Sequence, residues 1–270
     1  MADIKRIAFL GGGNMAEAII KGLLRENSGI PLMVAEISAE RRGYLAITYP
    51  NIRIVENSSE AAAWGEIVIL AIKPQQASSV LATLERTLSP DKLIVSIMAG
   101  VRTGSIEEAL ENGTRVVRVM PNTPALVGLG ATAICPGRKA TPLDLDRVES
   151  IFAQAGLVVR VEEKQMDAVT GLSGSGPAYV FTFVEALSDA GVKNGLSREI
   201  ASRLAVQTVL GAASMLSGTG EHPALLREKV TSPGGTTIAG LHIMENGRFR
   251  GVIMDAVDAA TQRSRELAGK

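Results

Sequence analysis

The sequence predicts an α/β domain built on a parallel β-sheet, followed by an all-helical domain. Two observations lead to this fold class. Up to about residue 163, short β-branched runs alternate with helical patterns, which is typical of parallel strands joined by crossover helices. From about Gln165 onward, only helical patterns follow. We therefore expect one domain over residues 1–163 and a second over residues 164–270.

Apolar runs and apolar residues at helical spacing predict the individual elements. Buried strands are expected at residues 4–10, 32–37, 67–72, 93–98, 115–120 and 157–161. Between the first two strands, Asn14 to Arg25 carries Ile19 and Leu23 on one helical face. Later helices are expected at residues 178–190, 198–215, 224–230, 236–245 and 251–267. Ser197 is expected to cap the second of these, and Pro223 to lie early in the third.

Composition excludes several classes of protein. A chain of 270 residues can bury a core without help from disulfides or metals. Its 28 basic and 28 acidic residues balance, so no overall positive field favours nucleic acid. The single Cys135 excludes an internal disulfide framework and fits a reducing compartment. The first apolar run is too short for a signal peptide, and no uncharged run is expected to approach the ~18 residues of a membrane span. We therefore expect a soluble cytoplasmic chain.

The segment from Leu196 to Leu216 is apolar on most faces of a helix. Such a helix must be buried all round. The helical part is too small to enclose it alone, so we expect a second subunit to cover it. The alternative is that it runs through the centre of its own domain.

A glycine-rich motif lies where the first strand ends and the first helix begins. Residues 11–16 read Gly-Gly-Gly-Asn-Met-Ala, which fits the G-x-G-x-x-[G/A] fingerprint in its strand–helix context. Gly11 permits a tight turn, Gly13 lets the backbone approach a pyrophosphate, and Ala16 lets the helix pack on the strand. The free N–H groups of the helix start then bind the anion. We predict a Rossmann-type dinucleotide site; the alternative is a glycine turn that binds nothing.

The residues after the second strand leave the coenzyme preference open. Glu36 occupies the position where an acid usually binds the adenosine ribose hydroxyls and repels a 2′-phosphate. Arg41 and Arg42 follow closely and are candidates for binding such a phosphate. Either kind of residue is also compatible with simple exposure to solvent. Both NADH and NADPH are therefore retained, with a slight preference for NADH.

Other polar residues follow the later strands of the expected sheet. Ligands of open α/β sheets lie beyond the carboxyl ends of the strands. Lys73 and Pro74 end the strand at 67–72, and Asn57 lies in a comparable loop. Asn122 and Thr123 stand between two prolines that stiffen their loop. The alternatives are a strand-end lysine in solvent and a simple rigid turn.

Two small-residue segments in the helical part suggest a second binding site. Residues 171–177 and 232–237 each place glycines just before a helix, which presents backbone N–H groups to an anion such as a carboxylate. Thr236 and Thr237 add hydroxyl groups beside the second segment. Helix capping and tight packing between helices are the alternative explanation.

No metal or covalent mechanism is indicated. The sequence has no H-E-x-x-H, no Cys/His cluster and no G-x-S-x-G motif. His222 and His242 stand alone, and Cys135, just before Pro136, is expected to be a buried thiol at a strand end.

These residues resemble the pyrroline-5-carboxylate reductase family, the last enzymes of proline biosynthesis. The resemblance covers essentially the whole chain, and the segments that carry it are FLGGGNM at 9–15, AIKP at 71–74, MPNTP at 120–124, DAVTGLSGSGPAY at 167–179 and SPGGTTI at 232–238. It implies a Rossmann domain and a helical domain that dimerises by interlocking helices, with dimers sometimes assembling into decamers. The implied reaction reduces (S)-1-pyrroline-5-carboxylate to L-proline with NADH or NADPH.

The resemblance also implies roles for individual residues. The cofactor site would comprise Leu10, Gly11, Gly12, Gly13, Asn14, Met15, Asn57, Ala71, Ile72, Lys73, Pro74, Ile97, Met98 and Ala99. The substrate site would comprise Glu163, Ser232, Gly234, Gly235, Thr236 and Thr237. Where many members carry polar or basic residues, this chain has Glu36-Ile37, so a preference for NADPH does not carry over.

We expect Thr237 to be the principal polar side chain at the reacting nitrogen, since a hydroxyl both donates and accepts hydrogen bonds. The alternative is that Thr237 only caps its helix. Two other functions remain possible at this level: a 3-hydroxyacid-type dehydrogenase, which needs a positioned lysine, and a cofactor-binding sensor without turnover. Lys164, Lys193 and Lys229 lie outside the two glycine segments, which disfavours the dehydrogenase.

Overall fold

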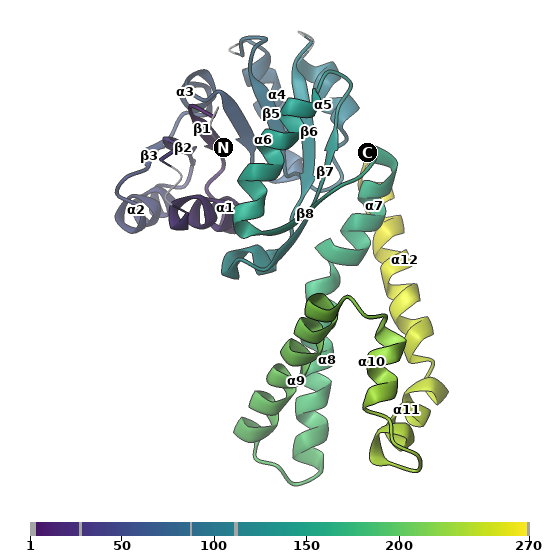
Figure 1. Ribbon diagram of the computed structural model, residues 1–270. Helices are drawn as coiled ribbons and strands as arrows, with labels where there is room; N and C mark the ends of the chain where they lie inside the picture. Colours follow the sequence, from purple (N-terminus) through teal and green to yellow (C-terminus); the bar gives the residue numbers. More distant parts are fainter. Residues whose placement is uncertain (1–3, 27–28, 87, 111–112, 269–270) are drawn as a thin grey trace. The chain divides into compact units, whose positions relative to one another are not determined.

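The computed structural model describes residues 4–26, 29–86, 88–110 and 113–268 (Figure 1). The chain divides into two compact units. One, here called the sheet unit, comprises Met1–Ser175 and Ala259–Lys270, and the other, the helical unit, comprises Gly176–Asp258. The expected boundary after residue 163 thus falls inside the sheet unit.

The sheet unit is built on one eight-stranded sheet of order β3-β2-β1-β4-β5-β6-β7-β8. Every neighbouring pair is parallel except β6 and β7, which are antiparallel. The predicted α/β class is therefore confirmed. The strands are β1 Ile7–Leu10, β2 Leu32–Ala35, β3 Arg53–Val55, β4 Ile67–Leu70, β5 Leu93–Ser96, β6 Arg115–Met120, β7 Gly130–Pro136 and β8 Gly156–Arg160.

Helices cover both faces of this sheet. One face packs against α1, α2 and α6, and the other against α3, α4 and α5 (Figure 1). The alternation along β1 explains both cores, because Ile7 and Phe9 point to the first face while Ala8 and Leu10 point to the second. The helices are α1 Asn14–Arg25, α2 Ala39–Thr48, α3 Ser58–Trp64, α4 Ala77–Glu85, α5 Thr103–Leu110, α6 Pro142–Phe152 and α7 Met166–Val169. Short 3₁₀ turns are η1 Pro74–Gln76, η2 Thr123–Val127, η3 Ala153–Ala155 and η4 Glu163–Gln165.

The sheet corrects three of the sequence-based expectations. Strands β3 and β7 were not predicted, and the antiparallel β7 makes the sheet mixed instead of purely parallel. The last strand was expected to be buried, yet Leu157 and Val159 of β8 are exposed. Their exposure follows from position, because β8 is the terminal strand of the sheet and has a neighbour on one side only.

The glycine segment at residues 171–177 separates α7 from α8, but most of it is itself helical. Thr170–Gly174 forms a π-helical turn between α7 and α8, so this segment is not a loop of glycines before a helix. A Cβ at Gly174 would lie 2.6 Å from Cε of Met120, so the end of this methionine side chain would have to move.

The helical unit contains α8 Gly176–Lys193, α9 Arg198–Thr219, α10 Pro223–Lys229, α11 Thr236–Asn246 and the first part of α12 Phe249–Ala268. The expected helix starts are confirmed: Ser197 caps α9 by accepting a hydrogen bond from the Ile200 N–H, and Pro223 is the first residue of α10. The side chains of α8 and α12 meet, with the rings of Phe183 and Phe249 6.0 Å apart.

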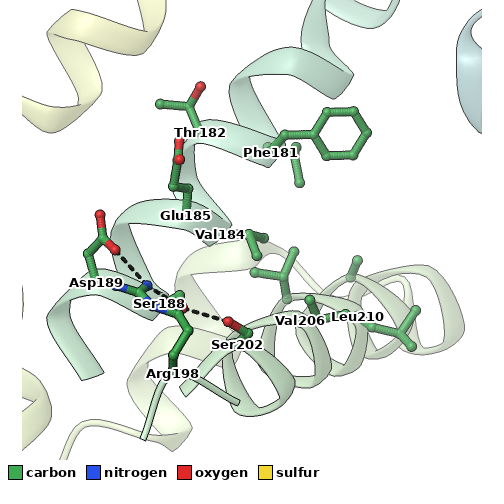
Figure 2. Close-up of a pocket in the computed structure, with 13 residues that line it drawn as sticks. Phe181, Thr182, Val184, Glu185, Ser188, Asp189, Arg198, Ser202, Val206 and Leu210 are labelled. Atoms are coloured by element: carbon green, nitrogen blue, oxygen red, sulfur yellow. Dashed lines mark hydrogen bonds and ion pairs between the residues drawn. The ribbon is translucent and has the colours of Figure 1, made fainter. Parts of the chain in front are cut away.

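The helical unit has almost no core of its own. Of its residues Gly176–Asp258, all of them described, only Ser188, Ala201 and Ala205 are buried. The alternative that α9 runs through the centre of its own domain is therefore wrong. Between α8 and α9 the unit opens into a pocket of about 1010 Å³ with Phe181, Val206 and Leu210 on its walls (Figure 2).

Helix α9 also corrects an expectation about uncharged segments. Residues 204–220 carry no charged side chain, and α9 is long and apolar enough, by length and composition alone, to cross a membrane. It is the one such helix among the described residues.

Candidate functional site

The glycine loop between β1 and α1 has the conformation that its sequence requires. Gly11 has φ +98°, a left-handed value, and a side chain there would collide with the carbonyl oxygen of Ala71. A side chain at Gly12 would lie 2.6 Å from Cδ1 of Leu45, so this residue packs flat against α2. A side chain at Gly13 would begin in open space, with no other heavy atom within 4 Å of its Cβ, so the backbone there is open to a ligand.

Helix α1 begins without a side-chain cap. Its N-cap is Gly13, and no side chain in the described part of the chain caps its first N–H groups. The next two helices are both capped, α2 by Ser38 and α3 by Asn57. The exposed N–H groups of α1 therefore form an anion-binding position beside the glycine loop.

A pocket of about 350 Å³ lies at this edge of the sheet, which is within the size range of small-molecule sites. It is lined by Gly11, Gly13, Ala35, Glu36, Ile37, Ser38, Ser58, Ala71, Ile72, Lys73, Gln76 and Val80. The structure thus brings together the glycine loop, the acid after β2 and the segment after β4. A second pocket of about 630 Å³ in the same unit includes the predicted cofactor residues Pro74 and Ala99.

Glu36 does not point into bulk solvent. Its Oε2 accepts a hydrogen bond from the Gly12 N–H at 2.9 Å, and its Oε1 accepts one from the Ser38 N–H at 2.8 Å. These two bonds hold the carboxylate at the wall of the pocket, where the fingerprint expects a ribose-binding acid.

Both arginines of α2 are already paired. Arg41 donates from Nε to the Gly12 carbonyl at 2.7 Å and from Nη2 to Glu17 at 2.6 Å. Arg42 donates to the carbonyl oxygens of Glu36 and Ile37 and forms an ion pair with Glu56 at 2.9 Å.

Glu17 is a buried carboxylate behind the glycine loop. Its oxygens accept hydrogen bonds from Tyr49 at 2.8 Å, Arg41 at 2.6 Å and Tyr44 at 3.1 Å, and Lys21 lies 3.3 Å away. Burial alone would raise the pKa of Glu17, but these hydrogen bonds outweigh it and lower that pKa to about 2. Burial beside this carboxylate raises the pKa of Tyr49.

Three predicted cofactor residues have side chains committed elsewhere. Leu10 and Met98 are buried in the core under α3, α4 and α5, so only their backbone can contact a ligand. The Asn57 side chain accepts hydrogen bonds from the N–H groups of Ser59 and Glu60 and serves as the N-cap of α3.

Glu163 lies in a polar cluster of the sheet unit. Its Oε1 pairs with Nη1 of the buried Arg118 at 2.5 Å, and its Oε2 accepts from the Thr103 hydroxyl at 2.8 Å. Burial would raise the pKa of Glu163, but the hydrogen bonds from Thr103 and Arg118 lower it overall. Cys135, buried in β7 as expected, lies 3.5 Å from the same carboxylate, and burial first, then this charge, raises the pKa of its thiol to about 12.

Asn122 is used inside the sheet unit as part of a rigid turn. Its Nδ2 donates to the carbonyl of Ser173 at 3.0 Å, and its Oδ1 accepts from the Ala131 N–H at 2.8 Å. The side chain therefore joins β7 to the π-helical turn.

The segment 232–237 lies in the helical unit and differs from 171–177. Gly234 has φ +66°, and Gly235 is the N-cap of α11 without a side-chain cap. Thr237, in the first turn, is half-buried, and its hydroxyl has no hydrogen-bond partner among the residues described. The structure therefore contradicts the alternative in which Thr237 only caps its helix. Among the described residues no group of three or more acidic, histidine or cysteine side chains could hold a metal.

Comparison with known proteins places this geometry in a family. Residues 163–267 match the family described as pyrroline-5-carboxylate reductase dimerisation, and residues 6–100 match that described as NADP oxidoreductase coenzyme F420-dependent. A pyrroline-5-carboxylate reductase of Synechocystis is 47% identical over 98% of this chain and 99% of its own length. The chain belongs to the pyrroline-5-carboxylate reductase family. The predicted family is confirmed, and a dimerisation domain is present.

Further members of the pyrroline-5-carboxylate reductase family agree in sequence and fold. The Glycine max reductase is 44% identical over 99% of this chain and 97% of its own length. A solved structure of the Coxiella burnetii reductase has a TM-score of 0.93 and 37% identity, covering 98% of this chain and 99% of that one. A Plasmodium falciparum structure with NADP bound has a TM-score of 0.88 and 36% identity, covering 99% of both chains.

Sequence reasoning missed several residues at the site. Ser38, Ser58, Gln76 and Val80 line the pocket, and Glu17 lies behind it. Glu17 did carry a signal, because it is a charged residue between Ala16 and Ala18 on a helix expected to pack against the sheet. Its partners Tyr44 and Tyr49 carried none, since only the fold brings them to it.

Proposed function

We propose that this chain reduces (S)-1-pyrroline-5-carboxylate to L-proline with NADH or NADPH. The observation that carries the proposal is that each unit has one helix start that lacks a side-chain cap and follows a glycine segment, and that the two have different neighbouring residues. One, at Gly13, stands beside a glycine loop and an acid, and the other, at Gly235, stands beside a free hydroxyl on Thr237. The first suits a dinucleotide and the second suits a small carboxylate with a polar ring atom.

The residues of the sheet unit fit the cofactor. The open backbone at Gly13 and the free N–H groups of α1 accommodate a diphosphate, and Glu36 accommodates ribose hydroxyls. When bound, the reduced nicotinamide supplies a hydride, which is the difficult part of the chemistry.

The residues of the helical unit fit the substrate. The backbone from Ser232 to Gly235 and the first N–H groups of α11 bind the substrate carboxylate. The Thr237 hydroxyl lies in the same first turn, where it can orient the ring nitrogen and hold its proton. A protonated imine is already electrophilic, so orientation and placement of charge supply most of the catalysis. Thr236, in the same first turn, completes the proposed substrate site of the helical unit. Glu163 lies in the sheet unit, and its role toward the substrate stays a prediction from the resemblance.

We also propose an oligomeric assembly for this chain. The exposed apolar side chains of α9 and the pocket between α8 and α9 support a homodimer in which a second copy covers these helices (Figure 2). Since α9 faces the partner in this arrangement, we propose a cytoplasmic protein without a membrane span. We further propose that dimers assemble into a decamer and that the chain binds no nucleic acid.

One assay tests the function. We expect oxidation of NADH or NADPH, followed at the nicotinamide absorbance, with pyrroline-5-carboxylate and formation of proline by mass spectrometry. Turnover with 3-hydroxyacids instead would favour the dehydrogenase, although Lys164 and Lys229 are engaged in ion pairs with Glu162 and Glu221. Cofactor binding without turnover on any substrate would favour the sensor.

A further inference from the structure

We infer that Arg41 is a positioning residue for the dinucleotide, acting through the peptide of Gly12. The inference rests on the proposed function, because it assumes that the glycine loop binds NADH or NADPH. It concerns a part of the molecule that the reaction itself does not use: the polar cluster of Glu17, Arg41, Tyr44 and Tyr49 behind the loop.

Both backbone polar groups of Gly12 form hydrogen bonds with side chains. Its N–H donates to Glu36 at 2.9 Å, and its carbonyl accepts from Nε of Arg41 at 2.7 Å. Gly12 is buried against Leu45, whereas the next residue, Gly13, faces open space. The orientation of the Gly12 carbonyl therefore sets the direction in which the following N–H groups point toward a diphosphate.

Arg41 can hold that carbonyl because its guanidinium is itself fixed. Nη2 donates to Glu17 at 2.6 Å, and Cζ lies 4.7 Å from the centre of the Tyr44 ring. Glu17 is 5% exposed and remains ionised at physiological pH, so its charge is always present to hold Arg41.

The geometry requires arginine and not merely a positive charge. Two nitrogens of one planar group bond to two acceptors, the Gly12 carbonyl and the Glu17 carboxylate. A lysine ends in a single nitrogen on a flexible stem, and it cannot reproduce this fixed fork. Because Arg41 is committed in this way, it positions the loop for NADH and NADPH alike and does not bind a 2′-phosphate.

The test uses Arg41→Lys in the full-length chain, with Tyr49→Phe as the matched control. Tyr49→Phe removes a hydrogen bond to Glu17 but leaves the bridge from Glu17 through Arg41 to Gly12. Dissociation constants for NADH, NADPH and ADP-ribose are measured by calorimetry, which requires no turnover. We expect Arg41→Lys to weaken all three about tenfold or more, as the loss of a charge-assisted hydrogen bond predicts, and Tyr49→Phe to leave them unchanged.

A purely structural role would give a different pattern. It would lower the melting temperature of both variants and leave the dissociation constants of the folded proteins at the wild-type value, which overturns the inference. A loss of affinity for NADPH alone also overturns the inference, because Arg41 would then bind the 2′-phosphate. In the supporting case kcat at saturating NADH stays near wild type while KM for NADH rises.

Three further outcomes keep the inference separate from the proposed function. If Arg41→Lys does not fold, Glu17→Gln is measured in its place; weaker binding of all three ligands supports the inference, and unchanged binding overturns it. If the wild-type protein binds no dinucleotide, the proposed function fails and the inference fails with it. If the wild type binds and Arg41→Lys binds equally well, only the inference fails.

Discussion

Thr237 is the residue on which, in our proposal, the chemistry of the substrate site depends. Its hydroxyl has no partner among the described residues, and Gly235, not Thr237, occupies the N-cap of α11. We expect Thr237→Val to fold normally and bind cofactor normally, since valine keeps the shape of threonine. Loss of a catalytic hydrogen bond should lower kcat tenfold or more, about 1.4 kcal/mol in activation free energy.

The control for this variant is Thr231→Val. The Thr231 hydroxyl donates to the carbonyl of Arg227 at 2.7 Å and lies outside the proposed site. Its kcat should remain near wild type in steady-state assays. A folded Thr237→Val with wild-type kcat would show that the hydroxyl has no catalytic part.

Glu36 is the residue that we expect to influence the choice of coenzyme. Its carboxylate is fixed at the pocket wall by the N–H groups of Gly12 and Ser38, so a 2′-phosphate there would meet a like charge. We expect Glu36→Ser to raise the ratio of kcat/KM for NADPH over NADH by about tenfold, which corresponds to ~1.4 kcal/mol. Glu40→Ser, which removes an exposed acid from the first turn of α2, should leave the ratio unchanged. The same ratio in Glu36→Ser and wild type would contradict the assignment.

Glu17 makes the stability of the sheet unit depend on pH. Its pKa falls from 4.5 to about 2 on folding, so the unfolded chain binds more protons between these values. Stability from Glu17 is therefore fully present above about pH 5 and is lost as the pH falls toward 2, with an upper size of ~3 kcal/mol. The free energy of unfolding, measured in urea, should be higher for wild type than for Glu17→Gln at pH 7, and the difference should shrink by pH 3. A difference independent of pH would mean that Glu17 is not ionised in this cluster.

At the scale of elements, local sequence patterns were sufficient to predict the glycine loop and the elements around it. Helix α1 has the bounds Asn14–Arg25 that its apolar spacing predicts, and β6 has the bounds Arg115–Met120. Strand β7 was missed because its residues Gly130–Pro136 include glycine and proline and show no regular alternation. It forms because β6 and β8 pair with it on either side. This pairing cannot be predicted from the residues of β7 alone.

Some residues of the candidate site could be predicted from local sequence, whereas the contacts that hold them could not. The glycines, Glu36 and the segment after β4 were predicted because each lies where a strand ends. The partners of Arg41 and Glu163 were not predicted, since they come from segments far apart in the chain: Gly12 and Glu17 meet Arg41, and Thr103 and Arg118 meet Glu163. Such contacts depend on the folded sheet unit and leave no periodic pattern in the sequence.

Asn122 joins β7 to the π-helical turn and should be important for stability. Its buried side chain satisfies the Ala131 N–H of β7 and the Ser173 carbonyl of the π-helical turn. Asn122→Ala would leave both groups without that partner, and we expect the free energy of unfolding to fall by ~2 kcal/mol. Asn51→Ala, at an exposed position, is the control and should change it by less than ~0.5 kcal/mol. Equal stability of Asn122→Ala and wild type in urea unfolding would show that water replaces the side chain without cost.

At the scale of the whole molecule, we propose that the helical unit depends on a second copy of the chain. With only Ser188, Ala201 and Ala205 buried, its helices leave large apolar side chains exposed, among them Leu204 at 55% and Leu210 at 49%. The polar bonds beside them, from Arg198 to Asp189 and between Ser188 and Ser202, lie at one end of the α8–α9 pocket and do not cover it (Figure 2). Apolar area of this kind is characteristic of a dimer interface.

We therefore expect an obligate dimer, with a melting temperature that rises with protein concentration because folding and association are linked. Leu210→Glu places a charge on the wall of the pocket, and it should shift the protein to a monomer in sedimentation velocity at micromolar concentration and lower its melting temperature. Leu143→Glu, at a leucine of α6 in the sheet unit that is also about half exposed, should leave the dimer intact. A wild-type protein that sediments as a stable folded monomer would contradict this arrangement, because the apolar faces of α8 and α9 would then need no partner.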